Sequence, residues 1–368
     1  MIGKSDNKNN IIYIIMGGLL FSLMVGAVGF AVPIADTVRN SIDFCLTALI
    51  PSLFFLMLLS DFAVKTNVLS FILRPFGLIT KYIFRLDISL SSVIIFSMIG
   101  GYPVGAKLIA RLVAKGKISC KTAERMLCFC VNSGPAFLIS GVAIPLYSNV
   151  KIGIILFLSQ ILASFTVAFF TGIGNVAEKV KIPINKKPDY SKQLVGSVIG
   201  TVKSIALLCG FIIVFRVVIT VLTHIGVIGV IVNSLSSFLP NSANAIVTGL
   251  LEVTTGTLKC AEIPGIASLI TVCILTAFGG LCVHIQILAI LKNTKVKMKK
   301  FYLTRIIYVF ASVVYCHILM RLFDFNVSEN VFVNSSSDVK IFSVSPFASV
   351  MLLLLSIMLL LTLKKKAE

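Results

Sequence analysis

Apolar stretches long enough to span a membrane alternate with short basic segments along most of this chain. A helix needs about 20 mainly apolar residues to cross a hydrocarbon core of about 30 Å. The pattern therefore predicts an all-α polytopic membrane protein with roughly nine or ten crossings, in addition to re-entrant pieces. The predicted spans cover residues 11–33, 41–60, 120–147, 152–174, 194–222, 225–239, 265–291, 301–320 and 343–363.

Two polar, glycine-bearing interruptions occur in each half of the apolar pattern. The first half contains GGYPVGAK at residues 100–107 and NSGP at 132–135, and the second half contains EVTTGT at 252–257 and FGG at 278–280. Matching glycines of the two halves lie roughly 150 residues apart, as in transporters built from inverted repeats with a substrate site at the breaks. The pattern therefore predicts two inverted repeats with re-entrant hairpins and broken helices.

Composition narrows the class of protein further. The chain is 57% hydrophobic and 13% charged, with a mean hydropathy of +1.03, which excludes a soluble globular domain. The formal net charge is +19, and the basic residues lie between the apolar stretches. We therefore expect a lipid bilayer and no nucleic acid as partner. The positive-inside rule predicts that the Lys/Arg-rich segments 107–125, 179–192, 292–305 and 364–366 face the cytoplasm. A basic patch that binds anionic lipid would have the same composition.

The chain divides at its polar segments. We expect an N-terminal peripheral transmembrane helix in residues 1–40, a first repeat in 41–174 and a basic cytoplasmic linker in 175–193. A second repeat in 194–320, an external loop in 321–342 and a C-terminal transmembrane helix with a basic tail in 343–368 complete the chain.

Motifs of the common enzyme classes are absent from the sequence. The chain contains no GxxxxGK[ST] phosphate loop, no HExxH and no GxSxG, and its three histidines are isolated. Its nine cysteines are scattered, as expected of small buried apolar residues. We therefore predict that the protein is not an enzyme and carries no cofactor, no metal and no catalytic residue.

The breaks offer groups that suit an anion. Where a helix restarts inside a membrane, its first N–H groups are unpaired and carry the positive end of the helix dipole. Asn132, Ser133 and Gly134 form such a start, with Ser133 as the expected cap. Thr254 and Thr255 add hydroxyls at the second-half break. These residues predict a site for a small carboxylate, although small residues also let helices pack closely.

A few charged or polar side chains stand out within the apolar stretches. Glu252 must pair, protonate, bind a cation or face water, because a charge near the bilayer centre costs about 2.5–3.5 kcal/mol. Arg216 could neutralise an anionic substrate or extend to the interface, and His284 with Gln286 forms a candidate hydrogen-bond pair. Lys107 begins a basic helical face, which predicts either an interfacial amphipathic helix or a solvated face that sets topology.

The four motifs at these interruptions resemble those of the sporulation integral membrane proteins of the YlbJ type, within the nucleoside-recognition Gate-domain proteins. The resemblance covers residues 41–320 and implies two inverted Gate-type repeats, distantly similar to concentrative nucleoside transporters. It also implies transport of dipicolinate from the mother cell into the forespore across the outer forespore membrane. The polar sugar-binding groups of true nucleoside carriers are missing. The matching positions are Gly100, Gly101, Tyr102, Pro103, Gly105, Lys107, Asn132, Ser133, Gly134, Pro135, Glu252, Thr254, Thr255, Gly256, Gly279, Gly280, His284 and Gln286.

Three functions follow as competing hypotheses. The first is a carrier for a small anion, with dipicolinate as the expected substrate. The second is a scaffold or signalling component of the sporulation envelope that transports nothing, with a nucleoside carrier as a further alternative. The third is a membrane-embedded enzyme, against which the missing motifs argue. The paired breaks and Glu252 favour a carrier, because a scaffold has little use for polarity at the membrane midplane. A homo-oligomer is left open. The predicted substrate-binding residues are Gly101, Tyr102, Pro103, Asn132, Ser133, Gly134, Glu252, Thr254, Thr255, Gly279, Gly280, His284 and Gln286, with Lys107 and Arg216 as charge partners.

Overall fold

The computed structural model describes residues 30–66, 68, 73–175, 177–180 and 189–323, together with scattered positions between 13 and 29. These residues form helices and no β-strand. The C-terminal transmembrane helix and residues 324–342 of the predicted external loop lie outside the described residues, as do 9 of the 19 residues of the basic linker and 10 of the 23 residues of the predicted first span.

Five helices of the described part are long and apolar enough to cross a membrane. Other predicted spans are divided: the segment 120–147 contains two helices separated by an extended stretch, and the segment 225–239 holds only a ten-residue helix. The number of crossings therefore stays a prediction. The five are Ala31–Thr66, Val150–Gly172, Tyr190–His224, Gly265–Leu291 and Lys299–Leu322.

The helices of the first half are α2 (Ala31–Phe44) and α3 (Ile50–Thr66), joined by a π-helical turn, then α4 (Arg74–Tyr82), α5 (Ser91–Gly100), α6 (Tyr102–Ala114), α7 (Cys120–Cys130), α8 (Ile144–Tyr147), preceded by a π-helix over Phe137–Ala143, and α9 (Val150–Gly172). Those of the second half are α10 (Tyr190–His224), α11 (Val227–Ser236), α12 (Ala243–Leu251), α13 (Val253–Lys259), α14 (Gly265–Phe278), α15 (Gly280–Leu291) and α16 (Lys299–Leu322).

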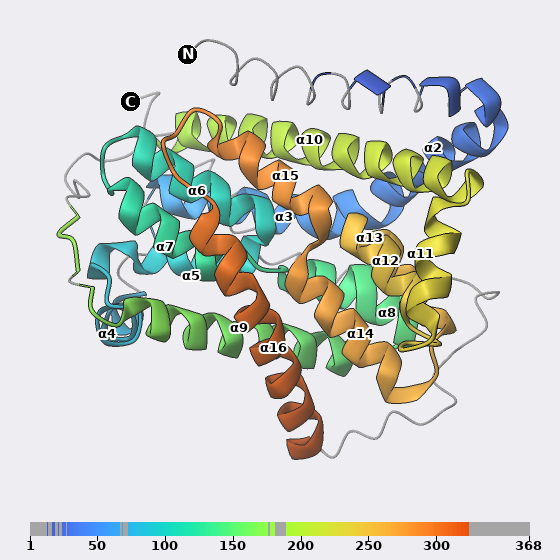
Figure 1. Ribbon diagram of the computed structural model, residues 1–368. Coiled ribbons are helices and arrows are strands. Elements are labelled where there is room, and N and C mark those ends of the chain that lie inside the picture. Colours follow the sequence, from blue (N-terminus) through green and yellow to red (C-terminus); the bar gives the residue numbers. More distant parts are fainter. Residues whose placement is uncertain are drawn as a thin grey trace, which may run out of the picture.

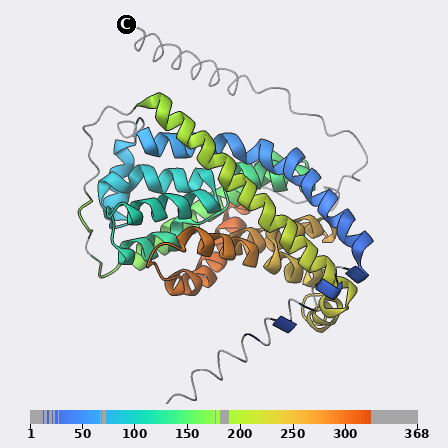
Figure 2. The ribbon, with the colours of Figure 1, turned by 90° about the horizontal axis from the view of Figure 1, so that it is seen from above.

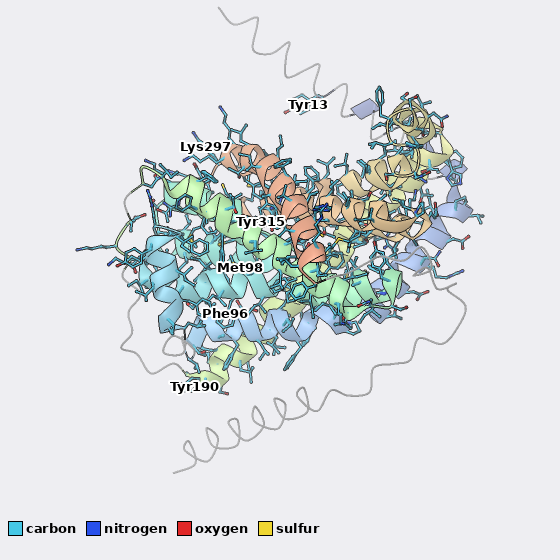
Figure 3. The ribbon with its side chains drawn as sticks, turned by 90° about the horizontal axis from the view of Figure 1, so that it is seen from below. Tyr13, Phe96, Met98, Tyr190, Lys297 and Tyr315 are labelled. Carbon is cyan, nitrogen blue, oxygen red and sulfur yellow. The ribbon has the colours of Figure 1, made fainter. Side chains whose placement is uncertain are left out.

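Two long contacts hold the halves together. Helix α10 runs antiparallel along α2 and α3 (Figure 2), with Thr37 Oγ1 2.8 Å from Thr220 Oγ1 near one end and Lys65 close to Gly196 near the other. Helices α9 and α16 cross each other (Figure 1), and Tyr315, labelled on α16 in Figure 3, bonds to Thr166 at 2.7 Å. Both halves contain two broken helices followed by a long one, whereas the inverted relation between them stays a prediction.

Candidate functional site

Four helix breaks, two from each half, meet in the interior of the bundle. Gly101 separates α5 from α6 with φ of 79°, and residues 131–134 separate α7 from the next helix. Glu252 separates α12 from α13, and Gly279 separates α14 from α15 with φ of 90°. Only glycine adopts such positive φ values without strain, so the sequence marks both of these turns.

Close contacts bring the breaks together in pairs within each half. A methyl group on Gly101 would lie 3.1 Å from the Gly134 nitrogen, and one on Gly280 would lie 3.2 Å from the Val253 nitrogen. A methyl group on Gly279 would in turn lie 3.3 Å from the ring of Tyr102, which belongs to the other half. The breaks of both halves therefore form one continuous structure.

A cavity of about 40 Å³ lies between these breaks. Its volume has room for about three water molecules, and apolar side chains supply much of its wall. Seven of the predicted site residues line it: Gly101, Tyr102, Pro103, Gly134, Glu252, Thr254 and Gln286. The other predicted residues are not among those that line it.

Glu252 caps helix α13 with its own carboxylate. The carboxylate accepts hydrogen bonds from the backbone nitrogens of Thr254 at 2.9 Å and Thr255 at 2.7 Å, and from their hydroxyls at 2.6 and 2.7 Å. A negative side chain at this place is stabilised by the helix dipole. The protein's own carboxylate thus occupies the hydroxyls of Thr254 and Thr255, which the sequence offered as donors for a substrate anion.

Arg216 lies beside this carboxylate on helix α10. Its Nε is 3.6 Å from Glu252 Oε2, its Nη2 donates to Thr254 Oγ1 at 3.0 Å, and its guanidinium stacks 4.5 Å from the Phe44 ring centroid. The side chain is 11% exposed, so it lies largely inside the protein. Glu252 and Arg216 therefore form one buried ion pair next to the cavity.

Asn132 and Ser133 do not line the cavity, and the predicted cap at Ser133 is wrong because its hydroxyl bonds to groups on other helices. The Ser133 hydroxyl contacts the Tyr102 hydroxyl and donates to the Thr276 carbonyl at 3.0 Å. Its backbone N–H donates to Gln160 Oε1 at 3.1 Å, and Asn132 donates to Ser164 at 3.2 Å. The Ser133 N–H is therefore already satisfied in this conformation.

His284 and Gln286 do not form the predicted hydrogen-bond pair. His284 is 4% exposed, and its Nε2 lies 3.1 Å from the Phe278 carbonyl among aromatic rings. Gln286 donates to Cys282 Sγ at 3.3 Å and lines the cavity. Residues two apart on a helix point in different directions, which explains the separation.

Lys107 points toward α10 and not to solvent, so the prediction of a solvated face is wrong at this residue, whereas the interfacial helix stays a prediction. Its ammonium donates to the Gly200 carbonyl at 2.9 Å and to Ser204 at 3.2 Å on α10. It lines a second cavity of about 40 Å³ that shares Pro103, Leu208 and Gln286 with the first. A cation therefore lies beside the central cavity.

Asp61 is the acid at the centre of this basic face, and sequence reasoning missed it. It is 2% exposed, and it pairs with Lys65 at 2.7 Å and with Arg111 at 3.2 Å. The signal was available, because an acid in the apolar helix 50–66 with a lysine four residues later is uncommon.

Arg305 and Gln160 were also missed, and each joins the two halves. Arg305, 1% exposed, donates to the carbonyls of Val131 at 2.6 Å and Phe278 at 3.1 Å, at the ends of α7 and α14. Gln160 contacts Ser133 as above and donates to Thr276 Oγ1 at 3.1 Å. Cations stabilise helix C-termini, so Arg305 holds two broken helices at their negative ends.

Metal binding finds no support in the described part of the chain. No three His, Cys, Asp or Glu side chains come together there in a group that could hold a metal ion. All nine cysteines are free and most are buried.

Comparison with known proteins agrees with the motif resemblance. Over 289 residues the chain is 28% identical to a sporulation integral membrane protein, YlbJ, of Bacillus subtilis (strain 168), and the match covers 70% of each chain. This similarity supports the YlbJ-type assignment. No protein-family model and no solved structure matches the chain.

Proposed function

We propose that this YlbJ-type membrane protein carries a small anionic solute during sporulation, with dipicolinate as the expected substrate and the outer forespore membrane as the site of action. The relative's name supports the sporulation context and the membrane location. The observation that carries the proposal is the cavity bounded by helix breaks from both halves of the chain. Paired breaks at one central site are the arrangement that secondary transporters use.

The charges near the cavity support an anion as the solute. Arg216 lies behind Thr254 in the wall of the first cavity, and Lys107 lines the adjoining one. Glu252 opposes an anion, but its carboxylate is occupied by the start of α13. A substrate carboxylate can therefore bind at Arg216 only if the Glu252–Arg216 ion pair breaks or shifts as a unit.

The cavity must enlarge before it can hold such a solute. Sites for small organic molecules measure about 300–1,000 Å³, whereas this one measures about 40 Å³. The turns at Gly101 and Gly279 are the places where the backbone can rotate without strain. We infer that half-helices α6 and α15 move about these glycines, with no catalytic step.

Uptake into proteoliposomes that contain only this protein tests the proposal. We expect dipicolinate to accumulate and uridine not to. Replacing Lys107 by glutamine should lower dipicolinate uptake at least about tenfold, since a charge-assisted hydrogen bond contributes about 1.5–3 kcal/mol. The control is Lys115→Gln, on an exposed lysine at the end of the same helix, which should leave uptake unchanged.

Two outcomes would overturn the proposal. Accumulation of uridine without dipicolinate would make the protein a nucleoside carrier. If neither solute enters vesicles that contain folded protein, the scaffold or signalling function becomes the better explanation.

A further inference from the structure

A larger cavity, of about 230 Å³, lies apart from the central site. It opens between α7, the end of α9 and the first turns of α16. Its charged side chains are Lys121, Arg125 and Lys300, and its uncharged polar ones are Thr171, Asn175 and Thr304. No acidic residue lines it among those that the structure describes.

The acids closest in sequence to this cavity are engaged elsewhere. Glu124 accepts a hydrogen bond from the Lys297 backbone nitrogen at 3.1 Å. Glu178 accepts from the hydroxyls of Thr122 at 2.7 Å and Ser119 at 2.8 Å, and these hydrogen bonds, that of Thr122 first, lower the pKa of Glu178. Neither carboxylate lines the cavity, so its positive charge is not neutralised from within.

Arg125 gives the cavity a buried cation with an unused donor. The residue is 7% exposed, and its Nη2 donates to the carbonyls of Phe84 and Arg85. Its Nε–H is buried and has no partner in the described part of the chain. A buried guanidinium without a carboxylate is costly, and an anion in the cavity would reduce this cost.

An apolar surface continues from the mouth of this cavity along α16. Leu303 lines the cavity and is 61% exposed, and Ile306, Ile307 and Phe310 on the next turns are 74%, 54% and 72% exposed. These positions recur every three or four residues, so they form one stripe on the helix. A cationic cavity at the end of an apolar stripe matches an amphiphile with a negatively charged head.

We propose that this cavity binds the phosphate headgroup of an anionic phospholipid, whose acyl chains lie along the α16 stripe. The proposal is independent of what the central cavity carries. The Lys/Arg bias places the segments that form the cavity on the cytoplasmic side, where basic pockets between helices meet anionic headgroups. The phosphate would pair with Lys121 and Lys300 and receive the free Nε–H of Arg125.

The test measures lipid-dependent stability of the full chain in detergent. The melting temperature is recorded during titration with phosphatidylglycerol, with phosphatidylcholine and with soluble glycerol 1-phosphate. We expect phosphatidylglycerol alone to raise it. The variant Lys121→Gln/Lys300→Gln should need about 25-fold more phosphatidylglycerol, since each basic residue near an anionic surface contributes about 1 kcal/mol and 1.4 kcal/mol is tenfold.

The control variant, Lys192→Gln/Lys203→Gln, removes two exposed lysines from α10 and should titrate like the wild type. An equal response of both variants would overturn the proposal, as the lipid would then act through general charge. An equal effect of glycerol 1-phosphate and phosphatidylglycerol would also overturn it, in favour of a soluble anion.

Discussion

The breaks at Gly101 and Glu252 lie roughly 150 residues apart in matching places of the two halves, yet they use different chemistry. At Gly101 the chain turns with φ of 79° and adds no charge, and the neighbouring Tyr102 hydroxyl contacts Ser133 and the Thr276 carbonyl. At Glu252 the backbone is extended, with φ of −141°, and a carboxylate caps the new helix. A glycine turn is thus combined with neutral polarity in one half, and an extended residue is combined with charge in the other.

The first half also contains a buried acid, but this acid does not line the central cavity. It is Asp61 on α3, which lies among Lys65, Lys107 and Arg111. The second half places Glu252 in the cavity wall. The comparison teaches that breaks at corresponding positions of the two halves can carry different side chains, which here makes the surroundings of the cavity asymmetric.

Removing either acid should have the largest effect. We expect Asp61→Ala and Glu252→Ala each to lower the free energy of unfolding by about 3–5 kcal/mol, because each leaves buried cations unpaired. The amide variants should distinguish the two acids. Glu252→Gln keeps an oxygen that caps α13, so its loss of unfolding free energy should be clearly smaller than that of Glu252→Ala. Asp61→Asn removes the charge that three cations surround, so its loss should stay large. Denaturant unfolding in micelles measures both. Equal losses in Asp61→Asn and Glu252→Gln would contradict the distinction.

Gly105 and Gly256, four residues after the breaks at Gly101 and Glu252, should show whether the two halves share close helix packing. A methyl group on Gly105 would collide with the Cys130 carbonyl, and one on Gly256 would lie 2.6 Å from the Gly249 nitrogen. We expect Gly105→Ala and Gly256→Ala each to cost about 1–3 kcal/mol of unfolding free energy through overpacking.

The control for these two variants is Gly210→Ala on α10, where a methyl group meets no atom within 4 Å. It should be neutral or stabilise the helix by up to about 1 kcal/mol. If only one of Gly105 and Gly256 proved sensitive, the two halves would not share their close packing.

The smallest loss of unfolding free energy should come from a substitution beside the uncharged break at Gly101. Tyr102→Phe removes a hydroxyl that joins the first half to Thr276 of the second, and should cost about 0.5–1.5 kcal/mol. Tyr82→Phe, at a tyrosine that is 66% exposed, should change nothing measurable in the same unfolding assay. A Tyr102 loss as large as that of Glu252→Ala would mean that neutral polarity contributes as much as charge.

Several parts of the site could be predicted because their signals are local. The glycines at 101 and 279 mark turns that other residues avoid, and Glu252 is conspicuous as an acid in an apolar stretch. Seven of the residues predicted from the sequence line one cavity in the structure. The cap at Ser133 and the pairing of His284 with Gln286 were wrong, because both groups found partners on other helices or on their own backbone.

The sequence by itself determined that the chain is helical and apolar, where its helices break, and that the breaks occur twice. Hydropathy and backbone preferences act over a few neighbouring residues, so they can be read along the chain. Only the tertiary structure decided which side chains meet at the breaks. Arg305 bonds to the carbonyl of Val131, 174 residues away, and Lys107 bonds to α10. A backbone carbonyl leaves no residue-specific mark, so partners of this kind appear only once the helices pack together.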